Sequence, residues 1–391
     1  MIENTCENNI LTIKPHGHVD SSNAAQVEAD ISALTALYPC ADIVIDAENL
    51  SYISSAGLRV VLKLRKKCAG LKIINASASV YEVLEMTGFT DMMTVMKAFR
   101  RVSVENCEII GRGANGVVYR LDDETIVKTY FDAGALNDMQ HDREIARRVF
   151  VLGVPTAIPY DVVKVGDAYG AVYEMLNARS LSGLLAENPD NIDKYAQSYV
   201  ELLRKIHATA VQPGDMPDIR IAALEWADFV KQYLPEKQFN KLHSMIKAVG
   251  EHNYMIHGDY HTNNVMMQND EPMLFDLDNV AVGHPVFEWA AIYMGFVGFC
   301  ELDSEATQRF LGIPRQTAMS FYRKALAIYM NTEDAEVLRD VEQKAQVICF
   351  MRLMRRAVRH TGLDTDRGQR EMSICRKKLD YLLECVDTLT F

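Results

Sequence analysis

The 391-residue sequence has no cysteine pattern of the kind that builds disulfide frameworks or zinc sites. Its eight cysteines are scattered, with no CxxC pair and no spacing typical of metal ligands. In a chain of this length, such a distribution indicates reduced thiols. We therefore expect a cytoplasmic protein.

The sequence also has no surplus of basic residues. It contains 41 lysine and arginine residues against 53 aspartate and glutamate residues, which gives a formal net charge of −12. Because affinity for a phosphate backbone comes from a basic surplus, this balance argues against nucleic acid as a partner.

Long hydrophobic runs are missing as well. The longest candidate, from Trp289 to Cys300, is too short for the ~20 apolar residues that span a bilayer. The opening residues, MIENTCENNI, lack the basic and apolar segments of a signal peptide. We therefore expect a soluble protein with no membrane partner.

The sequence does contain enough hydrophobic residues for more than one folded domain. At a typical ~150 residues per domain, the chain would hold two or three domains. Hydrophobic residues make up 49% of it, which is enough to bury more than one core.

The first hundred residues alternate between strand-like and helix-like segments. The runs ILTIKP, ADIVIDA and LKIINA have strand character. Three longer segments between and after them repeat apolar positions at helical spacing. The pattern predicts an α/β sandwich over residues 1–100.

Within this region, the segment LSYISSAGLRVVL resembles the centre of a STAS domain, the fold of anti-sigma factor antagonists. In that family a strand leads into a turn whose serine is phosphorylated, and Ser55 falls on this serine. Ser54 stands where the family usually has aspartate. The resemblance implies a regulatory domain that binds a protein partner, with Ser55 as a candidate phosphosite.

The two serines also have a simpler interpretation. A serine before an apolar helical run is usually an N-cap, which satisfies backbone amides at the start of the helix. A helix N-terminus also favours phosphate through its exposed amides and dipole. Capping and phosphorylation are therefore compatible.

A glycine-rich motif follows the first domain. Gly111, Gly113 and Gly116 have the GxGxxG spacing, and Val118 lies two positions beyond the last glycine. In dinucleotide-binding folds this spacing leads into a helix, whereas here a strand follows, and the next strand carries Lys128. This order is typical of the hairpin that covers the nucleotide in the kinase fold.

Lys128 lies in an otherwise apolar strand, which favours a role in ATP binding over a structural one. A buried ammonium group needs a carboxylate partner. Glu144, on the next predicted helix, is the expected partner, and Asp142 is the alternative.

The segment AVYEMLNARSLSGLL resembles the hinge between the two lobes of a kinase. In that interpretation, backbone groups from Glu174 to Leu176 contact adenine. An ordinary connection between a strand and a helix explains the pattern equally well.

Two further motifs, HGDYHTNN and FDLD, resemble the catalytic and metal loops of the aminoglycoside phosphotransferase and choline kinase family. The resemblance implies that Asp259 accepts the proton of an attacking hydroxyl. It also implies that Asn264 and Asp276 hold Mg²⁺, which bridges the phosphates of ATP. Asp278 either binds a second metal ion or caps the following turn.

Two histidines of the catalytic motif, His257 and His261, are interpreted as supports of the loop. Zinc would require a third ligand that no neighbouring residue offers. Downstream, His284 and Glu288 stand where the family has acidic residues that support the loop.

The predicted fold is an α/β STAS-like sandwich followed by a bilobal α+β protein-kinase-like phosphotransferase fold. We expect the STAS-like domain at residues 1–100, the N-lobe at 101–176 and the helical C-lobe at 177–391.

The favoured function is ATP- and Mg-dependent phosphorylation of a small-molecule hydroxyl. Asp276 is only nine residues from Pro285, which is too close for the long segment on which protein kinases bind a peptide. Two alternatives stay open: a protein kinase acting on a STAS serine such as Ser55, in cis or in trans, and a nucleotide-binding scaffold without turnover.

A basic stripe near the end of the chain bears on the acceptor. Arg352, Arg355, Arg356 and Arg359 recur at helical spacing. They form either a solvated face or a wall of the acceptor site, in which case the acceptor would be anionic.

Overall fold

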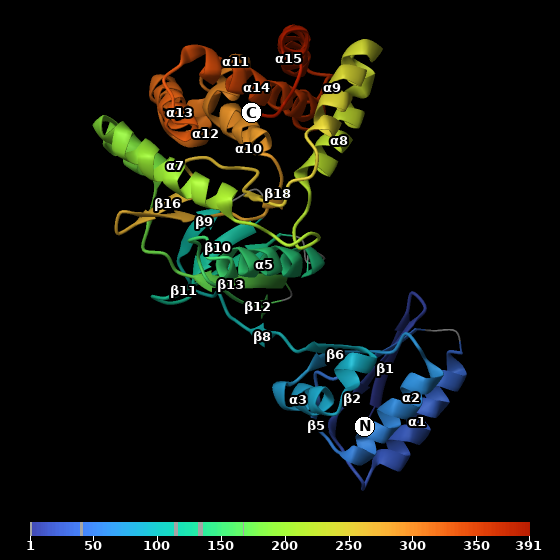
Figure 1. The fold of residues 1–391 in the computed structure, drawn as a ribbon. Coiled ribbons are helices and arrows are strands. Elements are labelled where there is room, and N and C mark those ends of the chain that lie inside the picture. Colours follow the sequence, from blue (N-terminus) through green and yellow to red (C-terminus); the bar gives the residue numbers. More distant parts are fainter. Residues whose placement is uncertain (1, 40–41, 113–115, 132–135, 167) are drawn as a thin grey trace. The chain divides into compact units, whose positions relative to one another are not determined.

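The computed structural model describes residues 2–39, 42–112, 116–131, 136–166 and 168–391 (Figure 1). The chain forms two compact units, Met1–Ser103 with Val163–Asp167, and Val104–Val162 with Ala168–Phe391. We refer to them as the N-terminal and the C-terminal unit. Gly113, one of the glycines predicted to bind the nucleotide, lies outside the described residues.

The N-terminal unit is built on a five-stranded sheet with the order β1-β2-β4-β6-β7. Strands β1 and β2 form an antiparallel hairpin, and each later neighbour pairs in parallel. Parallel neighbours require a crossover connection, which the helices of this unit provide. The elements are β1 (Ile2–Glu7), β2 (Ile10–Pro15), β3 (Gly17–Val19), α1 (Ala24–Leu37), β4 (Asp42–Asp46), β5 (Leu50–Ile53), α2 (Ser55–Lys67), β6 (Lys72–Ala76), α3 (Ala78–Met86), α4 (Phe89–Met92), β7 (Thr94–Lys97) and β8 (Arg100–Arg101).

The three runs with strand character form β2, β4 and β6, at the centre of this sheet. Their buried side chains alternate with more exposed ones, as the two faces of a strand require. In β2, Leu11 and Ile13 are completely buried, whereas Ile10 is exposed. Helices α1 and α2 pack their apolar side chains, such as Val27 and Val60, into the same core.

The C-terminal unit begins with strands arranged in the order β12-β13-β11-β10-β9. Strand β11 pairs antiparallel with β10 on one side and with β13 on the other. The glycine motif joins β9 to β10, and Lys128 lies in the central strand β11. The elements are β9 (Ile109–Arg112), β10 (Gly116–Arg120), β11 (Thr125–Tyr130), α5 (Leu136–Val151), β12 (Pro159–Val165), whose residues from Val163 onward belong to the N-terminal unit, and β13 (Ala168–Glu174).

The remainder of this unit is mainly helical, with short hairpins that carry the catalytic and metal motifs. Two π-helical turns, η3 (Met294–Gly298) and η4 (Ala357–Thr361), interrupt the long helices. The other elements are β14 (Arg179–Ser180), α6 (Leu181–Glu187), η1 (Pro189–Asn191), α7 (Ile192–Ala208), α8 (Ile219–Val230), η2 (Lys231–Tyr233), α9 (Glu236–Ala248), β15 (Met255–Ile256), β16 (Val265–Gln268), β17 (Glu271–Leu274), β18 (Ala281–Val282), α10 (Pro285–Tyr293), α11 (Phe299–Leu302), α12 (Ala306–Leu311), α13 (Arg315–Met330), α14 (Ala335–Arg356) and α15 (Asp366–Cys385).

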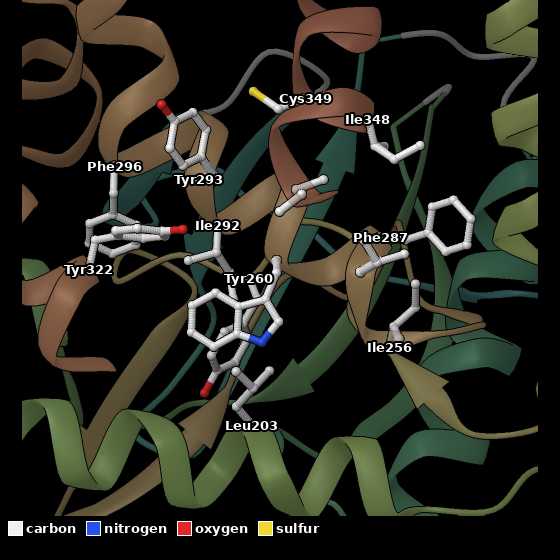
Figure 2. Close-up of a cluster of buried hydrophobic side chains, with 14 of the residues drawn as sticks. Leu203, Ile256, Tyr260, Phe287, Ile292, Tyr293, Phe296, Tyr322, Ile348 and Cys349 are labelled. Atoms are coloured by element: carbon white, nitrogen blue, oxygen red, sulfur yellow. The ribbon is translucent and has the colours of Figure 1, made fainter. Parts of the chain in front are cut away.

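The hydrophobic core of the helical part reaches the catalytic motif. Figure 2 shows Leu203 of α7, Ile292 of α10 and Ile348 of α14 in one buried cluster. Tyr260, which follows Asp259 directly, lies in the same cluster and is completely buried. The burial of Tyr260 in this core therefore holds the catalytic motif in position.

The described helices give no candidate for a membrane span, because each is too short or too polar to cross a bilayer.

Candidate active site

A cavity of about 360 Å³ lies between the strands of the C-terminal unit and the metal motif. Six of the residues predicted to bind nucleotide or metal line it. They are Gly111, Gly116, Val118, Lys128, Asp276 and Asp278. The sequence placed these residues in two distant segments, and the fold brings them to one site.

Gly116 is the first residue of β10 and pairs with Tyr130 of β11. A Cβ atom at this position would lie 1.9 Å from the carbonyl oxygen of Thr129, so no other residue fits without moving the strand. The strand pairing by itself therefore requires this glycine, in addition to any approach of a phosphate. Gly111 is different, because a Cβ there would make ordinary contact with Val118 at 3.6 Å.

Lys128 extends from β11 towards two carboxylates of the metal motif. Its Nζ lies 3.2 Å from Oδ2 of Asp278 and 3.9 Å from Oδ1 of Asp276. Burial alone would lower the pKa of Lys128, but the two carboxylates outweigh it and raise the pKa. Lys128 is therefore a charged ammonium group inside the cavity.

The expected ion pair between Lys128 and Glu144 does not form within the described structure. Both Arg147 and Arg148 donate to the Glu144 carboxylate, at 3.2 and 3.3 Å. These arginines are three and four residues further along α5, where side chains of a helix meet without closing a long loop. The alternative residue, Asp142, lines the cavity.

The predicted hinge has most of its amides engaged within the protein. The N–H of Glu174 donates to the Ile158 carbonyl at 3.0 Å, and the N–H of Met175 donates to the Glu124 carbonyl at 2.7 Å. In the described part of the chain, the Leu176 N–H has no such partner. Tyr173, at the end of β13, is the residue of this segment that lines the cavity.

Asp259 lies in the turn that follows β15. The turn starts at Gly258, whose φ of +79° suits glycine and where a Cβ would lie 2.5 Å from the Asn279 carbonyl oxygen. Nε2 of His261 lies 3.5 Å from Oδ2 of Asp259. Burial would raise the pKa of Asp259, but His261, His257 and Arg352 outweigh it and hold the pKa below its usual value. Asp259 is therefore an ionised carboxylate at neutral pH.

Asn264 and Asp276 are held beside Asp259 by backbone hydrogen bonds. Nδ2 of Asn264 donates to the Asp259 carbonyl at 3.1 Å, and the N–H of Phe275 donates to the Asn264 carbonyl at 2.8 Å. Asp276 itself has a φ of +56°, a conformation that aspartate adopts more readily than most residues. The two predicted metal ligands thus flank a single hairpin, with Asn264 just before β16 and Asp276 just after β17.

The oxygen atoms available here suit a magnesium ion. Because Nδ2 of Asn264 is already used as a donor, its Oδ1 is left to act as a ligand, and Asp276 supplies a carboxylate. Mg²⁺ prefers oxygen ligands and is usually held by one or two protein groups together with substrate phosphates. Within the described ranges, no three histidine, cysteine, aspartate or glutamate side chains form a complete metal site, so waters and substrate phosphates would complete the shell.

Glu288 of α10 holds in place the turn that carries Asp259, which we call the catalytic turn. Its completely buried carboxylate accepts the N–H groups of both His257 and Gly258, the second at 3.0 Å. Nε2 of His207 lies 3.8 Å from the same carboxylate. The position had been interpreted as a support of the loop, and the contacts show how the support is made.

We expect Glu288→Gln to lower turnover and stability together. A glutamine side chain would turn an NH₂ group towards one of the two backbone N–H groups and leave it without an acceptor. A buried donor left unsatisfied costs about 1–3 kcal/mol. Denaturant unfolding and the rate of ADP formation measure the two effects. Glu251→Gln, at an exposed carboxylate, is the control and should change neither; wild-type stability and rate in Glu288→Gln would contradict the assigned role.

In the N-terminal unit, the two serines at the start of α2 have different positions. Ser54 is the N-cap residue, and its Oγ accepts the N–H of Ala56 at 3.2 Å. Ser55 is the first residue of the helix and is exposed. Capping therefore occupies Ser54 and leaves the hydroxyl of Ser55 accessible.

Comparison with known proteins identifies both parts of the chain. The model of the phosphotransferase enzyme family matches residues 106–323, more than half of the sequence. The chain belongs to this family. A model of the STAS domain matches residues 1–103 of the same phosphotransferase. The fold predicted from the sequence, a STAS-like sandwich followed by a kinase-like phosphotransferase, is therefore confirmed.

Individual relatives match each part of this phosphotransferase. A protein designated an anti-sigma factor antagonist, BtrV of Bordetella bronchiseptica, is 40% identical over 83 residues, which is 20% of this chain and 71% of that protein. The ADP-bound aminoglycoside phosphotransferase APH(2'')-Ib is 15% identical, with 79% of this chain and 99% of that chain covered and a TM-score of 0.46. A choline/ethanolamine kinase family protein from Mesorhizobium loti is 14% identical, with coverage of 72% and 92% and a TM-score of 0.46.

Sequence reasoning missed two features of this site. Arg352 was seen only as part of a basic stripe, whereas it lies close enough to Asp259 to affect its pKa. The ion pair of Lys128 with Asp278 was assigned to a different carboxylate. The helical spacing of the arginines was the available signal for the first, and nothing local in the sequence indicates the second.

Proposed function

We propose that this phosphotransferase uses ATP and Mg²⁺ to phosphorylate a hydroxyl group of a small molecule. The observation that carries the proposal is the convergence of Lys128, Asp276 and Asp278 in one cavity, beside a turn that presents the ionised Asp259. A cation for phosphate groups, oxygen ligands for a metal and a base for the acceptor are the components that phosphoryl transfer requires.

In this proposal the nucleotide occupies the 360 Å³ cavity. Gly111 and Gly116 border the phosphates, Val118 packs against the base, and the ammonium group of Lys128 binds the phosphates. The N–H of Leu176 is available to adenine, while Glu174 supplies its carbonyl group. Within the described structure, Glu144 does not form an ion pair with Lys128. It stabilises helix α5 through its ion pairs with Arg147 and Arg148.

Asn264 and Asp276 would hold Mg²⁺, with Asp278 as a further carboxylate within reach of Lys128. When bound, the ion neutralises charge that builds up on the phosphate oxygens. Asn264 is oriented for this task by its bond to the Asp259 carbonyl, so the metal ligand and the base are fixed to each other.

The chemical step joins the hydroxyl oxygen of the acceptor to the γ-phosphorus of ATP. The bond from that phosphorus to the β–γ bridging oxygen breaks, and ADP leaves with the electron pair. The hydroxyl proton passes to the Asp259 carboxylate. His261 keeps this carboxylate in place by direct contact, and Glu288 does so by holding the backbone of the turn.

The segment after the metal motif favours a small acceptor. Helix α10 starts at Pro285, only nine positions after Asp276, and strand β18 between them pairs with β15. The N–H of Val282 also donates to the Pro217 carbonyl at 2.8 Å. The segment is thus short and bound to its neighbours, which leaves little backbone for an extended peptide to bind.

The exposed hydroxyl of Ser55 favours a second candidate function, phosphorylation of a STAS serine. Because Ser54 provides the cap, a kinase could modify Ser55 without removing the hydrogen bond that starts α2. In this second proposal the acceptor is a STAS serine, of the same chain or another, and the STAS domain binds a protein partner in either case.

One experiment separates the two functions. Intact protein with Mg²⁺ and ATP, offered a panel of small alcohols, should phosphorylate a member of the panel and leave Ser55 largely unmodified. Mass spectrometry of the protein and of the alcohols reads out both. Rapid addition of one phosphate per chain at Ser55, abolished by Ser55→Ala and by Asp259→Asn, would replace the first proposal by the second.

A further inference from the structure

Four arginines near the end of the chain form one face of a helix. Arg352, Arg355 and Arg356 belong to α14, and Arg359 follows in the π-helical turn η4. Residues three and four apart lie on the same side of a helix, so these four side chains are neighbours. We refer to them as the arginine face.

The arginine face has no carboxylate partners among the described residues, although the chain has 53 acidic residues. Arginines elsewhere do form such pairs: Arg309 with Asp303, and Arg367 with Glu371. A cluster of like charges repels itself unless something neutralises it. None of the four therefore forms an ion pair within the described fold, although the charges of Asp259 and Glu288 act on Arg352 from beyond ion-pair distance.

Aromatic rings support three of the four guanidinium groups. Arg352 lies 5.0 Å from the centre of the Trp226 ring and Arg355 lies 5.9 Å from that of Phe229, both on α8. Arg356 lies 5.2 Å from the centre of the Phe299 ring. Stacking on a ring fixes the plane of a guanidinium group and leaves its N–H donors free for a planar anion.

Arg352 brings this face to the catalytic base. Its side chain is half-buried, and burial lowers the pKa of its guanidinium group. Helix α14 packs against α10, whose Glu288 accepts the N–H groups of His257 and Gly258 next to Asp259. Arg352 therefore lies on the helix that packs against the support of the catalytic turn, and its positive charge helps to lower the pKa of Asp259.

A second cavity lies beside Arg356. Its volume is about 410 Å³, and Arg356, Phe299 and Phe310 are among the residues that line it. The ring of Phe310 lies 4.8 Å from that of His261, the neighbour of Asp259. The other two arginines of this cavity, Arg309 and Arg367, are paired with carboxylates, which leaves the charge of Arg356 uncompensated.

We propose that the acceptor carries an anionic group, a carboxylate or a phosphate, which Arg352 and Arg356 bind while its hydroxyl faces Asp259. This inference rests on the proposed function and specifies its substrate class. It excludes cationic acceptors, because an ammonium group would meet the arginine face. Bidentate binding of an oxyanion by arginine supplies both affinity and orientation.

The test uses intact protein loaded with Mg²⁺ and the non-hydrolysable analogue AMP-PNP. Four probes are titrated: glycerol, choline, glycerate and glycerol 3-phosphate. Trp226 lies under Arg352 and reports binding by fluorescence, with Trp226→Phe to identify its signal. We expect the two anionic probes to bind at least about tenfold more tightly than glycerol, and choline to bind no better than glycerol. The comparison of glycerate with glycerol 3-phosphate distinguishes a carboxylate from a phosphate site.

Variants connect this binding to the arginine face. Arg352→Gln should weaken the anionic probes about 10- to 100-fold without changing the affinity for AMP-PNP. Arg352→Lys, which keeps the charge, should recover part of the loss and controls for misfolding. Arg370→Gln, at an exposed arginine of α15, is the matched control and should bind as wild type does.

Three results would overturn the inference. The anionic probes could bind no more tightly than glycerol, their affinity could be unchanged in Arg352→Gln, or they could displace AMP-PNP instead of binding beside it. Failure of the proposed function is visible separately, because AMP-PNP would then not bind with Mg²⁺ in the first titration.

Discussion

Asp259→Asn will reduce phosphate transfer about 10²- to 10⁴-fold while nucleotide affinity stays close to that of the wild type. An amide has the size of the carboxylate but cannot accept the proton of the attacking hydroxyl. The bond from Asn264 should survive, because it is made to the backbone carbonyl of residue 259 and not to its side chain. The rate of ADP formation with an accepted alcohol measures the loss, and calorimetry measures nucleotide binding.

The control for this change is Asp270→Asn, in the turn between β16 and β17. Asp270 makes an exposed ion pair with Lys194 at 2.8 Å, and pairs of this kind contribute little. The Asp270→Asn substitution removes one negative charge, as Asp259→Asn does, from the same part of the chain, and it should leave the rate of phosphate transfer unaltered. If Asp259→Asn transferred phosphate as fast as the wild type, the base would have to be sought elsewhere.

Asp276→Asn will have its largest effect on nucleotide binding instead. Removing this carboxylate takes away a proposed ligand of Mg²⁺ and one of the two partners of Lys128. Changes even to residues that only orient a metal ligand cost 10- to 100-fold in affinity, so we expect a loss of at least about 100-fold here. Titrations of ATP with and without Mg²⁺ measure it, and the difference between them should nearly disappear in the variant.

Asp278→Asn is the informative comparison. Its carboxylate is nearer to Lys128, at 3.2 Å, than that of Asp276, at 3.9 Å. If Asp278 serves Lys128 alone, its substitution should weaken ATP binding equally with and without Mg²⁺. If it also holds metal, the loss should again depend on Mg²⁺. Mg²⁺-dependent binding that survived in Asp276→Asn would remove Asp276 from the metal site.

The parts of the fold that were predictable depend on short-range patterns. Strands β2, β4 and β6 were visible because buried strands need apolar residues over a few positions. The catalytic turn was visible because Asp259 and Asn264 are only five residues apart and their bond closes within one loop. Such features are specified where they occur in the chain.

The choice of long-range partners was not predictable in the same way. Lys128 and Asp278 are 150 residues apart, and the sequence offers many carboxylates at other distances. Glu144 was the nearest plausible one, but Arg147 and Arg148 on its own helix reach it at a lower entropic cost. Arg352 approaches Asp259 from 93 positions away only because α14 packs against α8 and α10.

Two reciprocal hydrogen bonds between Tyr199 and Tyr260 limit the mobility of the catalytic turn. The hydroxyl of Tyr199 on α7 donates to the Tyr260 carbonyl at 3.0 Å, and the hydroxyl of Tyr260 donates to the Tyr199 carbonyl at 2.8 Å. Both rings are completely buried, with their centres 4.4 Å apart. Opening the turn would therefore break two buried bonds and expose two rings, an event close in free energy to unfolding the helical core. The turn that carries Asp259 is a loop by its backbone conformation, but it unfolds together with the helical core. Closure around a substrate therefore has to come from the strands on the other side of the cavity.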